Sequence, residues 1–251
     1  MVHRNYLNSY IYLEVIYLEK NRKLIAAYLL TILTFLSLIF WGSKSVTVLS
    51  ESDPIDREHR FIIDAGHGGV DGGATSCTGK LESAFNLEIA LRLNDLMRFI
   101  GCGTRMIRTQ DVSIYTKGDS IAQKKVSDLK ERVRICNETD GAILISIHQN
   151  TFPESRYSGA QVFYGRSEGS EQLAKALQEA FIRHANPGSS RKAKKSDGIY
   201  LMEHIECAGV LIECGFLSNP EEEAKLRSAE YQKQLCCIIA STIVNFAYAN
   251  S

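Results

Sequence analysis

Residues 60–69 read RFIIDAGHGG, a short apolar run that stops at a glycine-rich loop. This pattern predicts a buried strand over 60–64, and similar apolar runs recur at 142–147 (AILISI) and 209–212 (GVLI). Segments in which apolar residues recur at helical spacing separate these runs. Strands that alternate with helices favour an α/β layered domain, with helices flanking a mostly parallel, mixed central sheet.

The remaining elements follow from the same periodicities, and the domain contains no internal repeat or low-complexity tract. We therefore expect it to fold as one unit. The further expected strands are 104–109, 159–164 and 198–202, and the expected helices are 84–100, 119–138, 170–184, 221–228 and 231–248.

Residues 24–43 (LIAAYLLTILTFLSLIFWGS) contain no charged side chain. A helix of this length is about 30 Å long, the hydrocarbon thickness of a bilayer, so the segment is predicted to span a membrane. The basic residues before it indicate that the N-terminus is cytoplasmic and the rest lies outside. Gly42-Ser43-Lys44 is a poor cleavage site, which favours a retained anchor over a cleaved signal peptide. We expect a short N-terminal segment (1–23), a tether (44–59) and a globular domain (60–251).

Composition excludes several classes of protein. The chain has 251 residues, of which 45% are hydrophobic, and this excludes a disordered protein. Its 29 basic and 29 acidic side chains give no net charge to draw it onto nucleic acid, so no nucleic-acid partner is expected. The seven cysteines are odd in number and form no C-x-x-C, which argues against a disulfide framework and a thiolate zinc site.

Polar residues follow three of the expected strands, at the edge of the sheet where α/β proteins bind ligands. They are His67, His148 and Glu213, and Glu82 lies near the start of the helix after the first strand. Two imidazoles and a carboxylate form a typical hydrolytic zinc set, and a second carboxylate can carry the proton. On spacing alone, ordinary loop histidines and a first-turn acid that complements the helix dipole stay open as alternatives.

Four short motifs occur in order along the chain: Asp64-Ala-Gly-His-Gly-Gly69, Glu82-Ser-Ala-Phe-Asn-Leu87, Ser146-Ile-His-Gln-Asn150 and Ile212-Glu-Cys-Gly-Phe-Leu-Ser-Asn219. Together they resemble the zinc-dependent N-acetylmuramoyl-L-alanine amidases over about residues 60 to 248. The resemblance implies that His67, Glu82 and His148 hold one Zn²⁺ and that Glu213 is the catalytic acid/base. It further implies that the substrate is peptidoglycan, cut between N-acetylmuramic acid and L-alanine.

Three further segments look like the spore-cortex, germination-linked branch of that family: Asp128-Leu-Lys-Glu-Arg-Val133, Arg191-Lys-Ala-Lys194 and Gly198-Ile-Tyr-Leu-Met202. That branch implies a first step toward muramic δ-lactam, an extracytoplasmic domain in the forespore intermembrane space or cortex, and an accessory lipoprotein. Asn150 and Arg191 are candidate substrate contacts, although Arg191 can equally belong to a solvated basic loop.

Two other functions use the same residues and stay open. A zinc peptidase acting within the stem peptide would need the same ligands. A catalytically silent wall-binding protein of this fold would not need Glu213, and competent residues at all four positions count against it.

Overall fold

The computed structural model describes residues 21–22, 26, 28–34, 37 and 61–249. The chain divides into two units, Met1–Pro54 and Ile55–Ser251. The described residues of the first unit are helical. The expected segments 1–23 and 44–59 and the expected membrane span 24–43 lie wholly or largely outside the described residues. Within the described part of the chain, no helix has the length and apolar character needed to cross a bilayer.

The second unit is built on a six-stranded sheet of order β2-β1-β3-β6-β4-β5. The strands are β1 (Phe61–Ala65), β2 (Thr104–Met106), β3 (Ile143–Asn150), β4 (Gln161–Tyr164), β5 (Lys194–Lys195) and β6 (Ala208–Phe216). Neighbouring strands are parallel except β4, which runs antiparallel to β6. The expectation of a mixed, mostly parallel sheet flanked by helices is confirmed.

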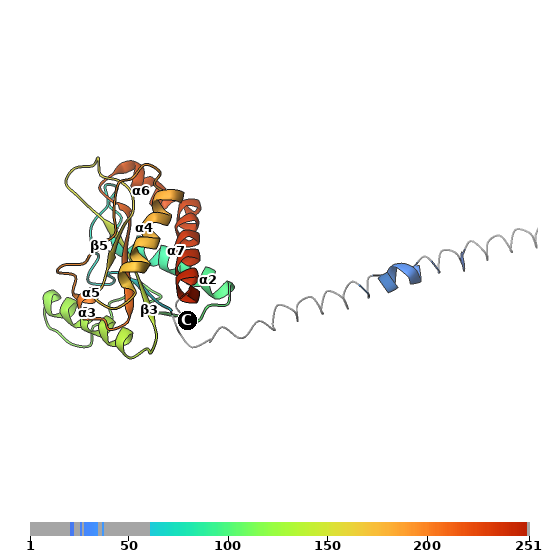
Figure 1. Ribbon diagram of the computed structural model, residues 1–251, viewed down its shortest axis with the longest axis horizontal. Helices are drawn as coiled ribbons and strands as arrows, with labels where there is room; N and C mark the ends of the chain where they lie inside the picture. The colour runs from blue at the N-terminus through green and yellow to red at the C-terminus, as the bar shows by residue number, and fades with distance from the viewer. Residues whose placement is uncertain (1–20, 23–25, 27, 35–36, 38–60, 250–251) are drawn as a thin grey trace, which may run out of the picture. The chain divides into compact units, whose positions relative to one another are not determined.

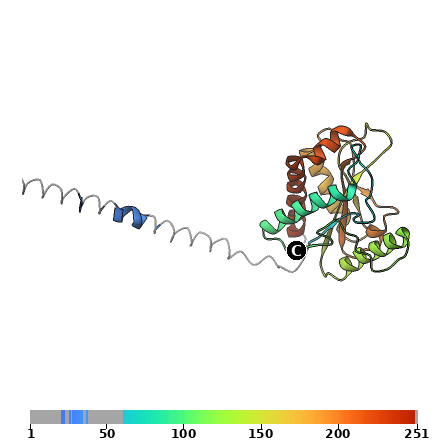
Figure 2. The ribbon, with the colours of Figure 1, turned by 180° about the vertical axis from the view of Figure 1, so that it is seen from behind.

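Helices cover both faces of this sheet (Figures 1 and 2). They are α2 (Glu82–Phe99), α3 (Ile121–Asn137), α4 (Ser170–His184), α5 (Tyr200–His204), α6 (Pro220–Arg227) and α7 (Ala229–Ala249). Alternate residues of β1 and β3 enter different cores. Ile63 and Ile145 pack with residues of α2, α4 and α7, whereas Ile62 and Leu144 pack with residues of α3 and α5. The sheet therefore separates two apolar layers and leaves its edges for polar residues.

Two of the helices begin at side-chain caps. Ser120 and Gln123 form a capping box at the start of α3, each accepting a hydrogen bond from the other's backbone N–H. Asn219 caps α6 by accepting from the backbone N–H of Glu221 and Glu222, and Pro220 follows it at the first helical position. These caps fix where α3 and α6 begin beside the sheet.

The expected strand at 198–202 is wrong, because this segment begins helix α5. Four consecutive apolar or aromatic residues are too few to separate a strand period from a helical one. Within α5 the rings of Tyr200 and His204 stack with centroids 3.9 Å apart, one helical turn from each other. The true edge strand, β5, consists of two exposed lysines and has no apolar pattern to reveal it.

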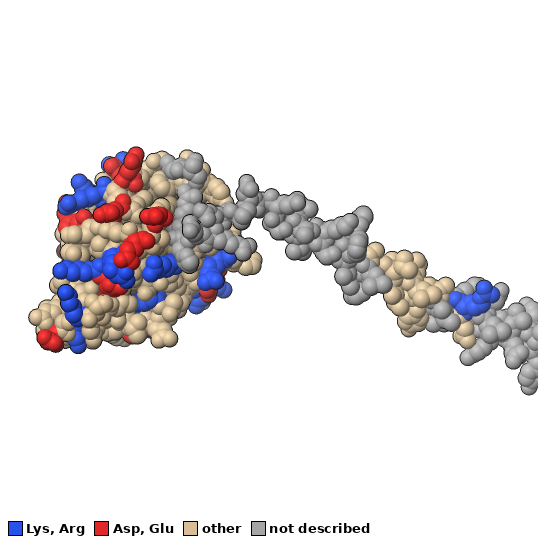
Figure 3. Space-filling model, turned by 90° about the horizontal axis from the view of Figure 1, so that it is seen from below, with Lys and Arg blue, Asp and Glu red and all other residues tan. Residues whose placement is uncertain are grey.

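Charged side chains of both signs are interspersed on the face of the globular unit seen in Figure 3. On the surface of this unit, Lys175 pairs with Glu171, and Arg134 pairs with Glu131 and Glu138. The equal numbers of acidic and basic residues in the chain leave it without net charge.

Candidate metal and catalytic site

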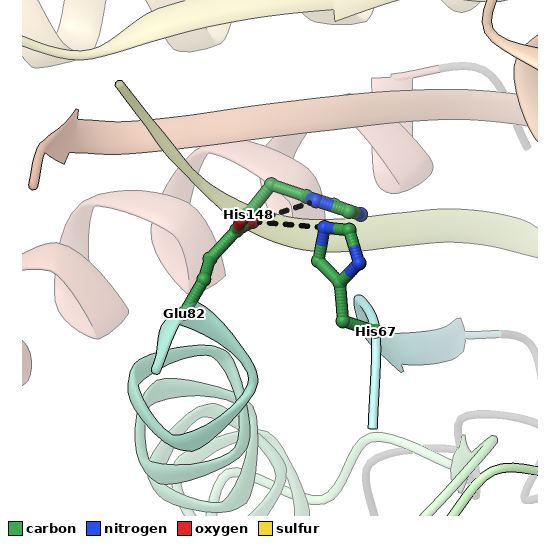
Figure 4. A group of neighbouring side chains, drawn as sticks. All are labelled: His67, Glu82 and His148. Carbon is green, nitrogen blue, oxygen red and sulfur yellow. Dashed lines mark hydrogen bonds and ion pairs between the residues drawn. The ribbon is translucent and has the colours of Figure 1, made fainter. Parts of the chain in front are cut away.

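Three segments distant in sequence meet at the carboxyl ends of β1 and β3. His67 lies in the loop after β1, Glu82 is the first residue of α2, and His148 lies near the end of β3. Their side chains point toward one another (Figure 4), and their ligand atoms all lie within 4.8 Å of one another. The structure thus brings together the three residues that the sequence pattern singled out.

Glu82 Oε1 lies at the centre of the group. It is 3.3 Å from His67 Nε2 and 3.1 Å from His148 Nδ1. The two imidazole rings approach edge to face, with centroids 4.9 Å apart. Each of the three residues therefore places one potential ligand atom in the same small volume.

Buried donors hold the Glu82 carboxylate in place. Asn86 Nδ2 and the Gln149 backbone N–H each donate to Oε1 at 3.2 Å, and the Ala74 N–H donates to Oε2 at 2.9 Å. Burial alone would raise the pKa of Glu82, but the neighbouring imidazoles of His148 and His67 lower it well below its ordinary value. Glu82 is therefore a fixed, ionised carboxylate.

Asp71 orients the His67 imidazole. The Asp71 carboxylate accepts from His67 Nδ1 at 2.9 Å and also pairs with Lys125 Nζ at 3.1 Å. This bond leaves Nε2 as the atom that faces Glu82, the arrangement usual for metal-binding histidines. Burial lowers the pKa of His67, but the hydrogen bonds to Glu82 and Asp71 outweigh it and raise the pKa.

Gly66 makes room for this arrangement. A methyl group at Gly66 would lie 2.1 Å from His148 Nε2, so only glycine lets the loop after β1 pass beside that ring. Gly73 has a backbone φ of +68°, and a side chain there would meet Glu82 Oε2 at 2.6 Å. The glycines of this region are thus required by close approach to the polar cluster.

The donor set fits a zinc ion. Ligand atoms bound to one tetrahedral zinc at about 2.1 Å lie roughly 3.4 Å apart, close to the 3.1 and 3.3 Å that separate Glu82 Oε1 from the two imidazole nitrogens. Two histidines and one glutamate are also a set found in catalytic zinc sites, which keep one position open for water or substrate. His67, Glu82 and His148 could therefore hold Zn²⁺.

Glu213 lies on the strand next to His148. The two residues pair in the β3–β6 register, so their side chains are neighbours on one face of the sheet. Glu213 Oε2 is buried and has no hydrogen-bond partner among the described residues. The pKa of Glu213 is raised to about 7, chiefly by burial. The neighbouring imidazoles of His148 and His67 oppose this rise, and the carboxylate of Glu82 adds to it. This carboxyl can exchange a proton near neutral pH.

The two candidate substrate contacts lie along the same edge of the sheet. Asn150 ends β3 and pairs in register with Phe216 of β6. The Arg191 guanidinium lies 4.8 Å from the centre of the Phe216 ring and donates to Ser158 O at 3.0 Å. Arg191 also lines an open pocket of about 790 Å³.

Sequence reasoning missed the residues that support the candidate ligands. Asp71, Asn86 and Gln149 were not assigned a role, although Asn86 and Gln149 lie within the motifs around Glu82 and His148. A carboxylate four residues after His67 and an amide one helical turn after Glu82 were the available signals.

The family to which this geometry belongs is established by comparison. Residues 61–245 match the Amidase_3 family, described as N-acetylmuramoyl-L-alanine amidase. The chain belongs to this amidase family. It is therefore an N-acetylmuramoyl-L-alanine amidase, as the four motifs indicated.

Individual relatives agree with this assignment. The amidase is 38% identical to the germination-specific N-acetylmuramoyl-L-alanine amidase of Bacillus subtilis (strain 168), over 74% of this chain and 78% of the relative. It is 35% identical to the CwlD amidase of Clostridioides difficile, solved in complex with the GerS lipoprotein, with a TM-score of 0.72 over 75% of this chain and 98% of that one. An N-acetylmuramoyl-L-alanine amidase of Clostridium difficile 630 is 28% identical, with a TM-score of 0.65 over 78% and 99% of the two chains.

Proposed function

We propose that this amidase is zinc-dependent and hydrolyses the bond between N-acetylmuramic acid and L-alanine in spore-cortex peptidoglycan. His67, Glu82 and His148 hold the zinc, and Glu213 carries the proton. The observation that carries the proposal is the convergence of three potential ligand atoms beside Glu213, whose buried Oε2 has no hydrogen-bond partner among the described residues.

Zinc, when bound, supplies Lewis-acid polarisation of the amide carbonyl and increases the acidity of a water molecule. Glu213 accepts the proton of the attacking water and then donates it to the amine nitrogen that leaves with L-alanine. Its pKa of about 7 suits both transfers, because an acid/base group works best when its pKa lies near the working pH. Asp71 keeps His67 in the tautomer that leaves Nε2 free to bind.

Asn150 and Arg191 are proposed substrate contacts. Both lie at the sheet edge that carries His148 and Glu213. Arg191 forms no ion pair with a carboxylate among the described residues. Its guanidinium is held against Phe216, so it can bind a carboxylate of the stem peptide.

The proposed setting of the reaction rests on the relatives and on the N-terminal sequence. A germination-specific relative supports a role in cortex, where removal of the peptide is the first step toward muramic δ-lactam. Residues 24–43 are proposed to anchor the chain, with residues 60–251 outside the cytoplasm. The complex of the C. difficile relative with a lipoprotein supports a similar accessory partner here.

Mass spectrometry of digested cortex peptidoglycan tests the reaction. We expect the full chain with zinc to release stem peptides that begin with L-alanine and to leave muramic acid without a peptide. Fragments cut within the stem peptide would instead identify a peptidase. Digests that release neither product, with the accessory lipoprotein also present, would favour a silent wall-binding protein.

Two variants separate the proposed roles. Glu213→Gln should retain zinc, measured by atomic absorption, and lose release of peptide by at least about 100-fold, since general acid–base catalysis contributes roughly 10²–10⁴. His148→Ala should lose both zinc binding and the release of peptide. A Glu213→Gln variant that still releases peptide at the wild-type rate would contradict the role given to this carboxyl.

A further inference from the structure

The backbone of His67 adopts an unfavourable conformation. Its φ of 61° makes it the one non-glycine residue with positive φ in the described part of the chain. A residue with a side chain disfavours this left-handed region and persists there only where surrounding contacts enforce it. The groups that enforce it thus determine where the His67 imidazole points.

Arg132 of α3 supplies one set of these contacts. Its Nη2 donates to the carbonyl oxygen of His67 itself at 2.8 Å, and its Nη1 donates to that of Ala65 at 3.1 Å. The guanidinium is almost fully buried, and Asp64 and Asp128 accept its remaining hydrogen bonds. Both acids pair with the charge and fix the plane of the guanidinium.

Arg108 approaches the same loop from after β2. Its Nε donates to Ala65 O at 2.7 Å, and its Nη2 donates to Gly66 O at 3.0 Å and to Ser83 O at 2.9 Å. Ser83 adjoins Glu82 at the start of α2. Arg108 is also buried, and it joins the loop that carries His67 to the helix that carries Glu82.

These contacts form a single arrangement. The carbonyl oxygens of three consecutive residues, Ala65, Gly66 and His67, all accept from two buried guanidinium groups. On the other side of the loop, the imidazole of His148 packs against Gly66. The rigid fork of a guanidinium can reach two carbonyls at once, which the single ammonium of lysine does not reproduce.

We propose that Arg132 and Arg108 are positioning residues of the metal site: they hold the 65–67 backbone in the strained conformation that aims His67 at Glu82 and His148. The inference rests on the proposed role of His67 as a zinc ligand. It assigns the Asp128–Val133 motif of α3 a function in metal binding, although α3 contributes no ligand.

The test compares Arg132→Lys with Arg134→Lys in the full chain. Arg132→Lys keeps a cation beside Asp64 and Asp128 but loses the fork between two carbonyls. Arg134 lies on the same helix, exposed, and pairs with Glu131 and Glu138, so Arg134→Lys is the matched control. Zinc affinity is measured by competition with a chelator, and the visible spectrum of the cobalt(II)-loaded protein reports ligand geometry. Thermal melting of the metal-free protein monitors the fold.

We expect Arg132→Lys to bind zinc at least about tenfold more weakly, as outer-shell changes usually do, and to alter the cobalt spectrum, while Arg134→Lys leaves both unchanged. Wild-type zinc affinity and an unchanged spectrum in a folded Arg132→Lys protein would overturn the inference. If Arg132→Lys does not fold, the same measurements on Arg108→Lys decide in the same way. A wild-type chain that binds neither metal would overturn the proposed function and this inference with it.

Discussion

Glu213 differs from an ordinary carboxyl because its folded environment favours the protonated form. Burial raises its pKa from the ordinary value of 4.5 to about 7. The folded protein therefore binds this proton more tightly than the unfolded chain does, and the associated stability is present below pH 4.5 and lost as the pH rises to 7.

A stability measurement on metal-free protein detects this effect. Relative to Glu213→Gln, which does not titrate, the wild-type free energy of unfolding should fall by up to about 3 kcal/mol between pH 4.5 and pH 8. Urea denaturation of both proteins across this range provides the comparison. If the free energies of unfolding of the two proteins change with pH in parallel, then folding does not raise the pKa of Glu213.

Gly66 gives a steric prediction at the same scale. In Gly66→Ala the added methyl lies 2.1 Å from His148 Nε2, so the ring or the loop must move. We expect a loss of about 1–3 kcal/mol in the free energy of unfolding, as for other overpacked sites, together with weaker zinc binding measured by chelator competition.

The matched control for that variant is Gly72→Ala. There the nearest atoms belong to the Leu81 side chain at 3.0 Å or more, and this flexible chain can shift. Zinc affinity should stay at the wild-type level in Gly72→Ala. Equal losses of zinc affinity in the two variants would contradict the account of Gly66.

At the scale of elements, the start of α6 depends on one side chain. Asn219 Oδ1 accepts from the N–H groups of Glu221 and Glu222, and its Nδ2 donates to Tyr157 O at 3.2 Å. Asn219→Ala should reduce the free energy of unfolding by about 1–2 kcal/mol. Asn219→Ser keeps a capping oxygen and should recover most of the loss in the same denaturation experiment. If both variants lose the same free energy of unfolding, the stabilisation comes from the hydrogen bond between Asn219 Nδ2 and Tyr157 O and not from the helix cap.

Elements with a strong apolar pattern were predictable from sequence. The central strands β1, β3 and β6 each contain a run of apolar residues, and each run leads to a polar residue of the site. The short pieces β5 and α5 were not predictable, because two exposed lysines and five helical residues carry too little periodicity.

The residues of the candidate site could likewise be predicted from the sequence only in part. His67, Glu82, His148 and Glu213 could be proposed because each follows the apolar run of a strand or opens a helix beside one edge of the sheet. Their supporting contacts were missed, because Arg108 and Arg132 act on backbone carbonyls. Such contacts depend on tertiary approach and leave no local pattern.

At the scale of the whole molecule, zinc binding should stabilise the fold, since a ligand that binds only the native state adds to the free energy of unfolding. At a free zinc concentration 100 times the Kd this amounts to about 2.7 kcal/mol, or a rise in Tm of about 5–10 °C for a domain of this size. Differential scanning calorimetry should find this rise in the wild type and in His184→Ala, which replaces an exposed histidine at the end of α4, but not in His67→Ala. A rise of equal size in His67→Ala would show that the zinc binds elsewhere.

The central claim is that His67, Glu82 and His148 hold one metal ion with Glu213 facing it. Anomalous diffraction at the zinc absorption edge, from crystals of the zinc-loaded chain, tests it most directly. We predict one strong peak bounded by His67 Nε2, the Glu82 carboxylate and His148 Nδ1, with the Glu213 carboxyl turned toward it. Zinc bound to other residues, or a Glu213 side chain turned away from the ion, would contradict the account.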